Sequence, residues 1–216
     1  KMEATNRVVI LNTQLVLLGD SIIDNKTYVL DGEFSVLEHI QSKSKTPVTQ
    51  LALDGATTDD VISNQINEIP LGTSHIVLSV GGNDLLQNLS YLSNGPISNV
   101  NEALTGIQQH IFEPLEQRFE TIIEELSSQR ANLLICTVYE GDLGRTDEFK
   151  DVLDSSKIMV SSFNDIVYKT AKKYNADVLE LREIFITSDD YANPIEPSHT
   201  GGEKLAKSIV EWIKNG

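Results

Sequence analysis

The chain has 216 residues, of which 40% are apolar and 23% are charged, and these proportions are typical of a single soluble globular domain. A net charge of −15 argues against nucleic acid and anionic membrane surfaces as partners, because both require a basic face. The apolar run Val8–Leu18 is interrupted by Asn12, Thr13 and Gln14, and it is too short to span a membrane.

Short β-branched runs alternate with helical patterns along the chain. We predict strands at residues 14–18, 48–53, 75–80, 133–138 and 177–179. We predict helices at residues 34–41, 59–69, 100–126, 156–174 and 202–214, with Pro114 kinking or restarting the third of them. Strands that alternate with helices predict a parallel sheet, and continuous apolar strands predict burial on both faces. The expected fold is α/β, a single three-layer α/β/α domain over residues 1–216 around five parallel strands.

The only cysteine, Cys136, lies in an apolar run and has no partner for an internal disulfide. We expect a buried, unreactive thiol there, because no charged residue is adjacent in sequence. One cysteine fits a cytoplasmic location, which we expect. A signal peptide already removed from the N-terminus is the alternative that the sequence leaves open.

Small residues and residues with acyl-transfer chemistry follow four of the five predicted strands. The first strand leads into Gly19-Asp20-Ser21, the second into Gly55, the third into Gly81-Gly82-Asn83-Asp84, and the fifth into a loop with Glu196 and His199. Parallel sheets bind ligands beyond the carboxyl ends of their strands, so we expect these residues to meet at one edge.

Three of these side chains have the chemistry of a catalytic triad. An alcohol is a weak nucleophile at neutral pH, so Ser21 would need a neutral imidazole, His199, to take its proton. A carboxylate, Glu196, would orient that imidazole and stabilise its charged form. Oxyanion donors would be the backbone N–H groups of Ser21 and Gly55 and the side-chain amide of Asn83. With His199 as the base, activity is expected to fall below about pH 6.

Together these blocks resemble the motifs of the SGNH (GDSL-type) serine hydrolase family. They stand as Gly19-Asp20-Ser21, Gly55, Gly82-Asn83-Asp84 and Glu196-Pro197-Ser198-His199, in the family's order and over nearly the whole chain. The resemblance implies a flavodoxin-like three-layer fold and an esterase that cleaves esters, thioesters or related acyl bonds through an acyl-enzyme on Ser21. It implies no metal and no other cofactor. No Gly-x-Ser-x-Gly turn is present, which argues against an ordinary α/β-hydrolase.

The match leaves two points open. Glu196 stands where the family has Asp, and its longer side chain would overshoot Nδ1 of His199 if the loop were unchanged. Asp189, Asp190 or a backbone carbonyl are the alternative partners of His199. In the third block, either Gly81 or Gly82 is the matching glycine.

Other residues near these motifs have simpler interpretations. We expect Asp20 to be a hydrogen-bonded turn carboxylate and Asp84 to be structural, at the start of a helix. Asp20, Gly82 and Tyr28 are also candidates for the pocket wall. The histidines without a partner at metal-ligand spacing are expected to be structural: His39, His75 and His110. The acidic segment 140–154 is expected to be a solvated face that can also rim the site.

The favoured substrates are small to medium acyl esters, because no lipase-like lid is apparent in the sequence. Two alternatives remain. One is a small-ligand-binding protein on the same fold, with a triad impaired by Glu196. The other is an acyltransferase that passes the acyl group to a sugar or another alcohol. No pattern indicates the oligomeric state.

Overall fold

The computed structural model describes residues 13–93 and 99–215, so residues 8–12 of the N-terminal apolar run lie outside the described part. Five parallel strands form one sheet in the order β2-β1-β3-β4-β5. They are β1 (Leu15–Gly19), β2 (Val48–Gln50), β3 (His75–Ser79), β4 (Asn132–Cys136) and β5 (Asp177–Leu179). The predicted five-stranded parallel sheet is confirmed. From β1 the chain adds β2 on one side and then β3, β4 and β5 on the other, so the switch point of the sheet lies between β1 and β3. Sheets of this kind bind ligands at the switch point.

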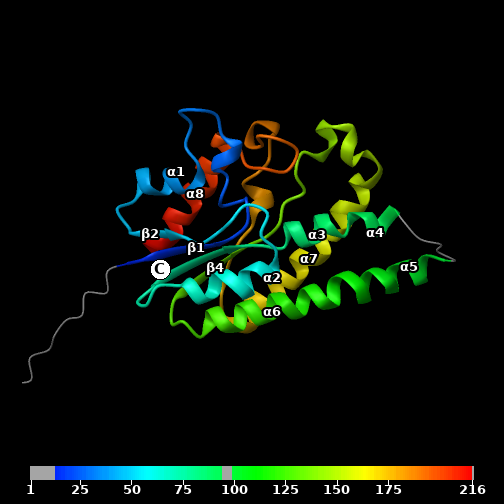
Figure 1. Cartoon of the computed structure of the whole chain (residues 1–216), viewed down its shortest axis with the longest axis horizontal. Helices are drawn as coiled ribbons and strands as arrows, with labels where there is room; N and C mark the ends of the chain where they lie inside the picture. Colours follow the sequence, from blue (N-terminus) through cyan, green and yellow to red (C-terminus); the bar gives the residue numbers. More distant parts are fainter. Residues whose placement is uncertain (1–12, 94–98, 216) are drawn as a thin grey trace, which may run out of the picture.

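The helices cover both faces of the sheet. They are α1 (Val36–Lys43), α2 (Thr58–Asp60), α3 (Gly82–Gln87), α4 (Leu89–Ser93), α5 (Val100–Ile107), α6 (Glu113–Ser127), α7 (Leu153–Tyr174) and α8 (His199–Asn215). Helices α1 and α8 pack on one face, and α6 and α7 pack on the other (Figure 1). Successive side chains of β1 point to opposite faces of the sheet. Leu15 and Leu17 therefore belong to the hydrophobic core under α1 and α8, and Val16 and Leu18 belong to the core under α6 and α7.

The long helical segment between β3 and β4 is interrupted at its proline, as predicted. One π-helical turn, Gln108–Phe112, separates α5 from α6. Pro114 lies in the first turn of α6, where its missing N–H leaves no unpaired donor. The regular α-helical hydrogen bonding is therefore interrupted just before the turn that contains the proline.

The second predicted strand and the second predicted helix also differ from the observed elements. Strand β2 ends at Gln50 rather than residue 53, because the N–H groups of Leu51 and Ala52 both donate to the carbonyl of Leu17. The predicted helix 59–69 is instead α2, a π turn and a 3-10 turn in succession. Within the described ranges, no helix is both long and apolar enough to cross a lipid bilayer.

Candidate active site

Ser21 follows the turn that ends β1. Gly19 has φ +122°, and a Cβ on it would lie 1.7 Å from the carbonyl oxygen of Ser79, so the close packing of β1 on β3 requires glycine. The N–H of Ile22 donates to Oδ1 of Asp20 at 3.1 Å, and this confirms Asp20 as a hydrogen-bonded turn carboxylate. The turn leaves Ser21 only 5% exposed at the carboxyl edge of the sheet.

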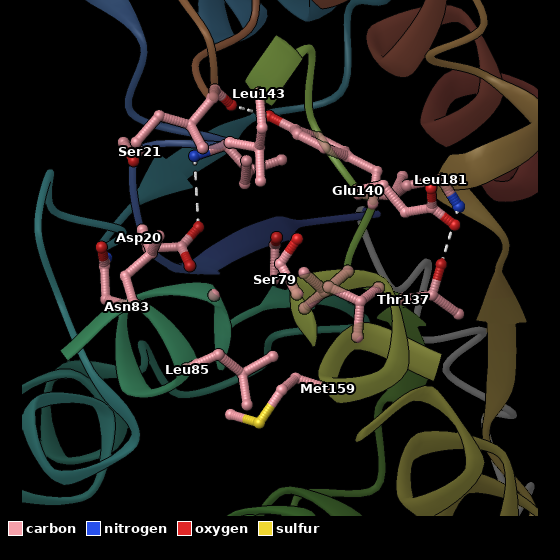
Figure 2. Close-up of a pocket in the computed structure, with 18 of the residues that line it drawn as sticks. Asp20, Ser21, Ser79, Asn83, Leu85, Thr137, Glu140, Leu143, Met159 and Leu181 are labelled. Atoms are coloured by element: carbon pink, nitrogen blue, oxygen red, sulfur yellow. Dashed lines mark hydrogen bonds between the residues drawn. The ribbon is translucent and has the colours of Figure 1, made fainter. Parts of the chain in front are cut away.

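Ser21 lines a cavity with a volume of about 70 Å³ between α3, α7 and the strand ends. Figure 2 shows Ser21 and Asn83 on one side of it and Thr137 and Leu181 on the opposite side. Leu85 and Met159 lie between them, contributed by α3 and α7 (Figure 2). The other apolar side chains of its wall are Ile22, Leu86, Leu89, Val138, Tyr139, Leu143, Val160 and Ile195. Apolar walls around a few polar groups are typical of sites for small ligands.

Burial raises the pKa of the Asp20 carboxyl well above its usual value, even though the N–H of Ile22 lowers it. The nearby carboxyl groups of Glu196 and Asp84 raise it further. Asp20 also lines the cavity, as expected for one of the pocket-wall candidates. The polar end of the cavity is therefore acidic, because several carboxyl groups share it.

Asn83 is held at the cavity by the first turn of α3. Its Nδ2 donates to the carbonyl of Ala56 at 3.0 Å, which orients the amide and leaves a second N–H for a ligand. Gly81, at φ +115°, precedes the helix, and a Cβ there would lie 2.4 Å from the ring of Phe163. A Cβ on Gly82 would find its nearest atom, Oδ2 of Asp20, 3.9 Å away. Only Gly81 is sterically required, and Gly82 lies in the cavity wall.

Gly55 lies beside Ala56 with φ +80°, in the turn after β2. It lines a neighbouring surface hollow together with Leu53 and Gln65, rather than the cavity of Ser21. Its place next to the residue that holds Asn83 keeps it near the polar end of the site. A role for its N–H in binding an oxyanion stays a prediction.

Glu196 lines the same cavity and is 8% exposed. Burial raises the pKa of its carboxyl group to about 7, although the nearby polar side chain of Ser21 lowers it, and Asp54 raises it further. Its Oε2 is buried and has no hydrogen-bond partner within the described residues. The structure thus places the carboxylate of the predicted triad in the same cavity as Ser21.

His199 is the first residue of α8 and faces α1 instead. Its Nδ1 accepts the N–H of Phe34 at 3.0 Å, and the carbonyl of Phe34 is 3.3 Å from the same nitrogen. Nε2 of His39 lies 3.2 Å from this Nδ1. No contact of His199 with Ser21 or Glu196 occurs among the hydrogen bonds of the described residues, and His199 does not line the cavity. Its predicted role as the base stays a prediction.

Three solved structures share this architecture over almost the whole chain. An acetyl xylan esterase from Geobacillus stearothermophilus is 14% identical, covering 93% of this chain and 94% of its own, with a TM-score of 0.61. An extracellular lipase from Streptomyces rimosus is 17% identical, covering 93% and 99%, with a TM-score of 0.63. Phospholipase A1 from Streptomyces albidoflavus NA297 is 15% identical, covering 92% and 99%, with a TM-score of 0.65.

This chain has the SGNH-hydrolase fold. No protein-family model and no curated protein matches the chain at the level of sequence. The chain is only 13–17% identical in sequence to the matching structures. The fold that was expected from four short motifs is therefore recognised from the three-dimensional structure.

Two of the acidic residues near the SGNH-hydrolase motifs have structural partners. Asp84 accepts from the N–H and hydroxyl of Thr58 at 3.0 and 2.6 Å, and it pairs with Arg118 at 3.1 Å. Asp84 is thus structural, as predicted, but it joins α3 to α2 and α6 instead of capping its own helix, whose N-cap is Gly81. Asp190 is fully buried and pairs with Lys204 at 2.7 Å, so its carboxylate is not available to orient His199.

Two further residues singled out in the sequence, Tyr28 and Cys136, do not line the cavity. Tyr28 donates to both carboxylate oxygens of Asp54 at 3.0 Å and is not part of the cavity wall. Cys136 is buried, and burial raises the pKa of its thiol, as expected for an unreactive cysteine. No group of three or more His, Cys, Asp or Glu side chains suited to a metal ion occurs in residues 13–93 and 99–215.

Two parts of the site are not indicated by the local sequence. The fourth strand end, which carries no acyl-transfer residue, supplies Thr137, Tyr139 and Glu140 to the cavity wall. The apolar and aromatic residues around them do not indicate a binding site. The one related prediction was that segment 140–154 could rim the site, and Glu140 and Leu143 of this segment do line the cavity. His39 was expected to be structural only, yet it contacts His199, and nothing in its local sequence indicates this.

Proposed function

We propose that this protein is an ester hydrolase that forms an acyl-enzyme on Ser21. The observation that carries the proposal is the apolar cavity at the switch point of the sheet, which Ser21 lines together with the buried Glu196 and with Asn83. The fold likeness to an acetyl xylan esterase, a lipase and a phospholipase A1 supports the same reaction class.

In this reaction, the Ser21 oxygen attacks the carbonyl carbon of an ester and releases the alcohol. The second N–H of the Asn83 amide would stabilise the oxyanion of the tetrahedral intermediate, together with the backbone N–H groups of Ser21 and Gly55. Water would then release the acid and regenerate Ser21.

The cavity favours short acyl chains. Its volume of about 70 Å³ is small, since one water molecule already needs roughly 10–15 Å³ of such space. An acyl group of a few carbons attached to Ser21 would lie among Leu85, Val138 and Met159. We therefore propose acetyl to butyryl esters, rather than long-chain lipids, as the substrate class.

The test is intact mass after treatment with a fluorophosphonate probe, together with hydrolysis of p-nitrophenyl acetate, butyrate and octanoate. We expect one adduct on the wild-type protein, no adduct on Ser21→Ala, and faster hydrolysis of the two short esters. Ser63→Ala, at an exposed serine, is the matched control and should behave as wild type.

Absence of an adduct on the wild-type protein from pH 6 to 9, with an active hydrolase labelled in parallel, would favour a binding protein on this fold. An adduct on Ser21 combined with acyl transfer to an added alcohol faster than to water would favour an acyltransferase.

A further inference from the structure

Two buried side-chain amides pair with the backbone at strand ends beside the cavity. Gln65 is 5% exposed and Asn164 is 1% exposed. Oε1 of Gln65 accepts the N–H of Gly19 at 2.7 Å, and its Nε2 donates to the carbonyl of Gly19 at 2.8 Å. Asn164 makes the same two bonds with Val138, at 2.8 and 2.7 Å. An amide that binds both polar groups of one residue fixes them as a neighbouring strand would.

Gln65 supplies a partner that β2 does not. Strand β2 ends at Gln50, which pairs with Leu17, so β2 stops before it reaches Gly19. The N–H of Leu53 donates to the carbonyl of Gly19 at 3.0 Å, but this leaves the N–H of Gly19 for Gln65. A buried backbone N–H needs a partner. The side chain of Gln65 therefore completes the sheet where β1 ends.

The residue that Gln65 holds belongs to the turn that carries Ser21. Ser21 is two positions after Gly19, and the N–H of Asp20 donates to the carbonyl of Ser79 at 3.0 Å. Strand β3 thus holds this turn from one side, and Gln65 holds it from the other. A glycine restricts its own backbone little. The position of the Ser21 hydroxyl therefore depends on these outside contacts.

The segment that carries Gln65 is attached to α3 at its other end. The carbonyl of Ala56 accepts a hydrogen bond from Nδ2 of Asn83 at 3.0 Å. Thr58 donates to Asp84 through its N–H and its hydroxyl, at 3.0 and 2.6 Å. The segment continues into a π-helical turn whose last residue is Gln65, and such turns are frequent at functional sites. One short segment thus connects α3 to the turn at the end of β1.

We propose that Gln65 is a positioning residue for the nucleophile, and this inference rests on the proposed function. By holding both polar groups of Gly19, it sets the place of the Ser21 hydroxyl relative to the Asn83 amide. Attack on an ester needs these two groups aligned on one carbonyl group, and a misplacement of about 1 Å can cost about 10²-fold in rate. Gln65 does not line the cavity of Ser21, so it acts without touching the substrate.

Asn164 offers a comparison within the same protein. It holds Val138, which follows Thr137, and Thr137 lies across the cavity from Ser21 and Asn83 (Figure 2). Asn164 therefore holds a wall of the cavity and not the turn of the nucleophile. The two amides make the same kind of bonds and are similarly buried. Their variants therefore separate a displacement of Ser21 from a general loosening of the sheet.

The experiment compares wild type with Gln65→Met, Gln65→Glu and Asn164→Leu. Methionine and leucine approximate the size of the amide side chains and remove both bonds. A protonated glutamate keeps both bonds, and burial favours this neutral form. Ile122→Ala, in the core but outside the cavity wall, is the control for a loss of stability alone.

Three quantities are measured at pH 6.5, at a temperature where every variant is folded. They are the rate of the fluorophosphonate adduct by intact mass, kcat and KM for p-nitrophenyl acetate, and the thermal unfolding temperature. We expect Gln65→Met to slow adduct formation and lower kcat by about 10–100-fold, with KM within about threefold of wild type. Gln65→Glu should stay within about fivefold of wild type. Asn164→Leu and Ile122→Ala should unfold at a lower temperature, yet keep at least about a fifth of the wild-type adduct rate.

A folded Gln65→Met variant within about threefold of the wild-type adduct rate overturns the inference. A loss in Asn164→Leu or Ile122→Ala as large as that in Gln65→Met also overturns it, because the effect would then follow stability alone. So does a Gln65→Glu variant as slow as Gln65→Met, because the bonds to Gly19 would not decide the rate. If Gln65→Met does not fold, Gln65→Asn, which is too short to keep both bonds, takes its place with the same limits.

In each of these cases, an adduct on Ser21 of the wild-type protein leaves the proposed function intact. No adduct on the wild-type protein overturns both the proposed function and the inference.

Discussion

Glu196 lines the same cavity as Ser21, while Nδ1 of His199 accepts a hydrogen bond from the backbone N–H of Phe34 at 3.0 Å. Glu196 and His199 are three positions apart in the sequence, yet their side chains face different elements. The start of α8 explains this, because Glu196 lies in the loop before the helix and His199 is the first residue of its first turn. The loop and the helix therefore present their side chains in different directions.

Asn83→Ala is expected to lower kcat for a short ester by about 10²–10³-fold with little change in KM, because the lost amide donor acts mainly on the transition state. Steady-state kinetics with p-nitrophenyl acetate measure this. Asn67→Ala, at an exposed asparagine, serves as the control. A loss smaller than about fivefold would remove Asn83 from the oxyanion site.

Met159→Ala is expected to enlarge the cavity and to shift the preference towards longer acyl chains. The ratio of kcat/KM for p-nitrophenyl octanoate to that for acetate should rise about tenfold or more, since each accommodated methylene is worth roughly 1–3 kcal/mol. The same change should lower the free energy of unfolding by about 2–4 kcal/mol. Ile122→Ala, in the same core but outside the cavity wall, should lose similar stability without a change in the ratio. An unchanged ratio in Met159→Ala would mean that the acyl chain binds elsewhere.

Gly81→Ala and Gly82→Ala separate the two candidate glycines. Gly81 has a positive φ, and a Cβ there would lie 2.4 Å from the ring of Phe163, so we expect a loss of about 2–3 kcal/mol in the free energy of unfolding. Gly82→Ala should cost less than about 1 kcal/mol, because its helical position leaves room for a methyl group. Urea unfolding at pH 7 measures both values. Equal losses would contradict the assignment of Gly81 as the required glycine.

Asp190 makes part of the stability depend on pH. Burial alone would raise the pKa of its carboxyl group, but Lys204 and the N–H groups of Thr187 and Ile186 outweigh burial and hold the pKa below its usual value of 3.8. A carboxyl group with a lowered pKa stabilises the fold above the unfolded-state value, and this contribution disappears as the pH falls through the folded-state value. Wild type should therefore lose more stability than Asp190→Asn between pH 7 and pH 3.

The control for this measurement is Asp189→Asn, at the exposed neighbour. Urea unfolding at both pH values should give the control the same pH dependence as wild type. If Asp190→Asn also keeps the wild-type dependence, the pair of Asp190 with Lys204 does not supply the effect.

The sequence by itself determined the sheet and the strand that leads into Ser21. The strands are continuous apolar runs separated by helical periodicity, and such patterns are local, so all five strands were predicted within a few residues. The turn that ends β1 was also local, because a glycine, a carboxylate and a hydroxyl in succession suit a strand end. The helix boundaries near residue 199 were less accurate, since Gly201 and Gly202 do not favour a helix. A Cβ on Gly201 would lie 2.2 Å from the carbonyl of Asp190, so the close packing of α8 explains that glycine.

Only the tertiary structure decided that Glu196 lines the cavity of Ser21 while His199 faces α1. The motif places Glu196 and His199 three residues apart, and either side chain can be imagined beside the serine. The outcome depends on long-range contacts, from Asn25 and Tyr139 to the loop and from Phe34 and His39 to the imidazole. The cavity wall is non-local in the same way, because strand ends and helices far apart in the chain form it together. Spacing along a chain fixes local geometry, whereas the direction of a side chain at a site is fixed by the groups that pack against it.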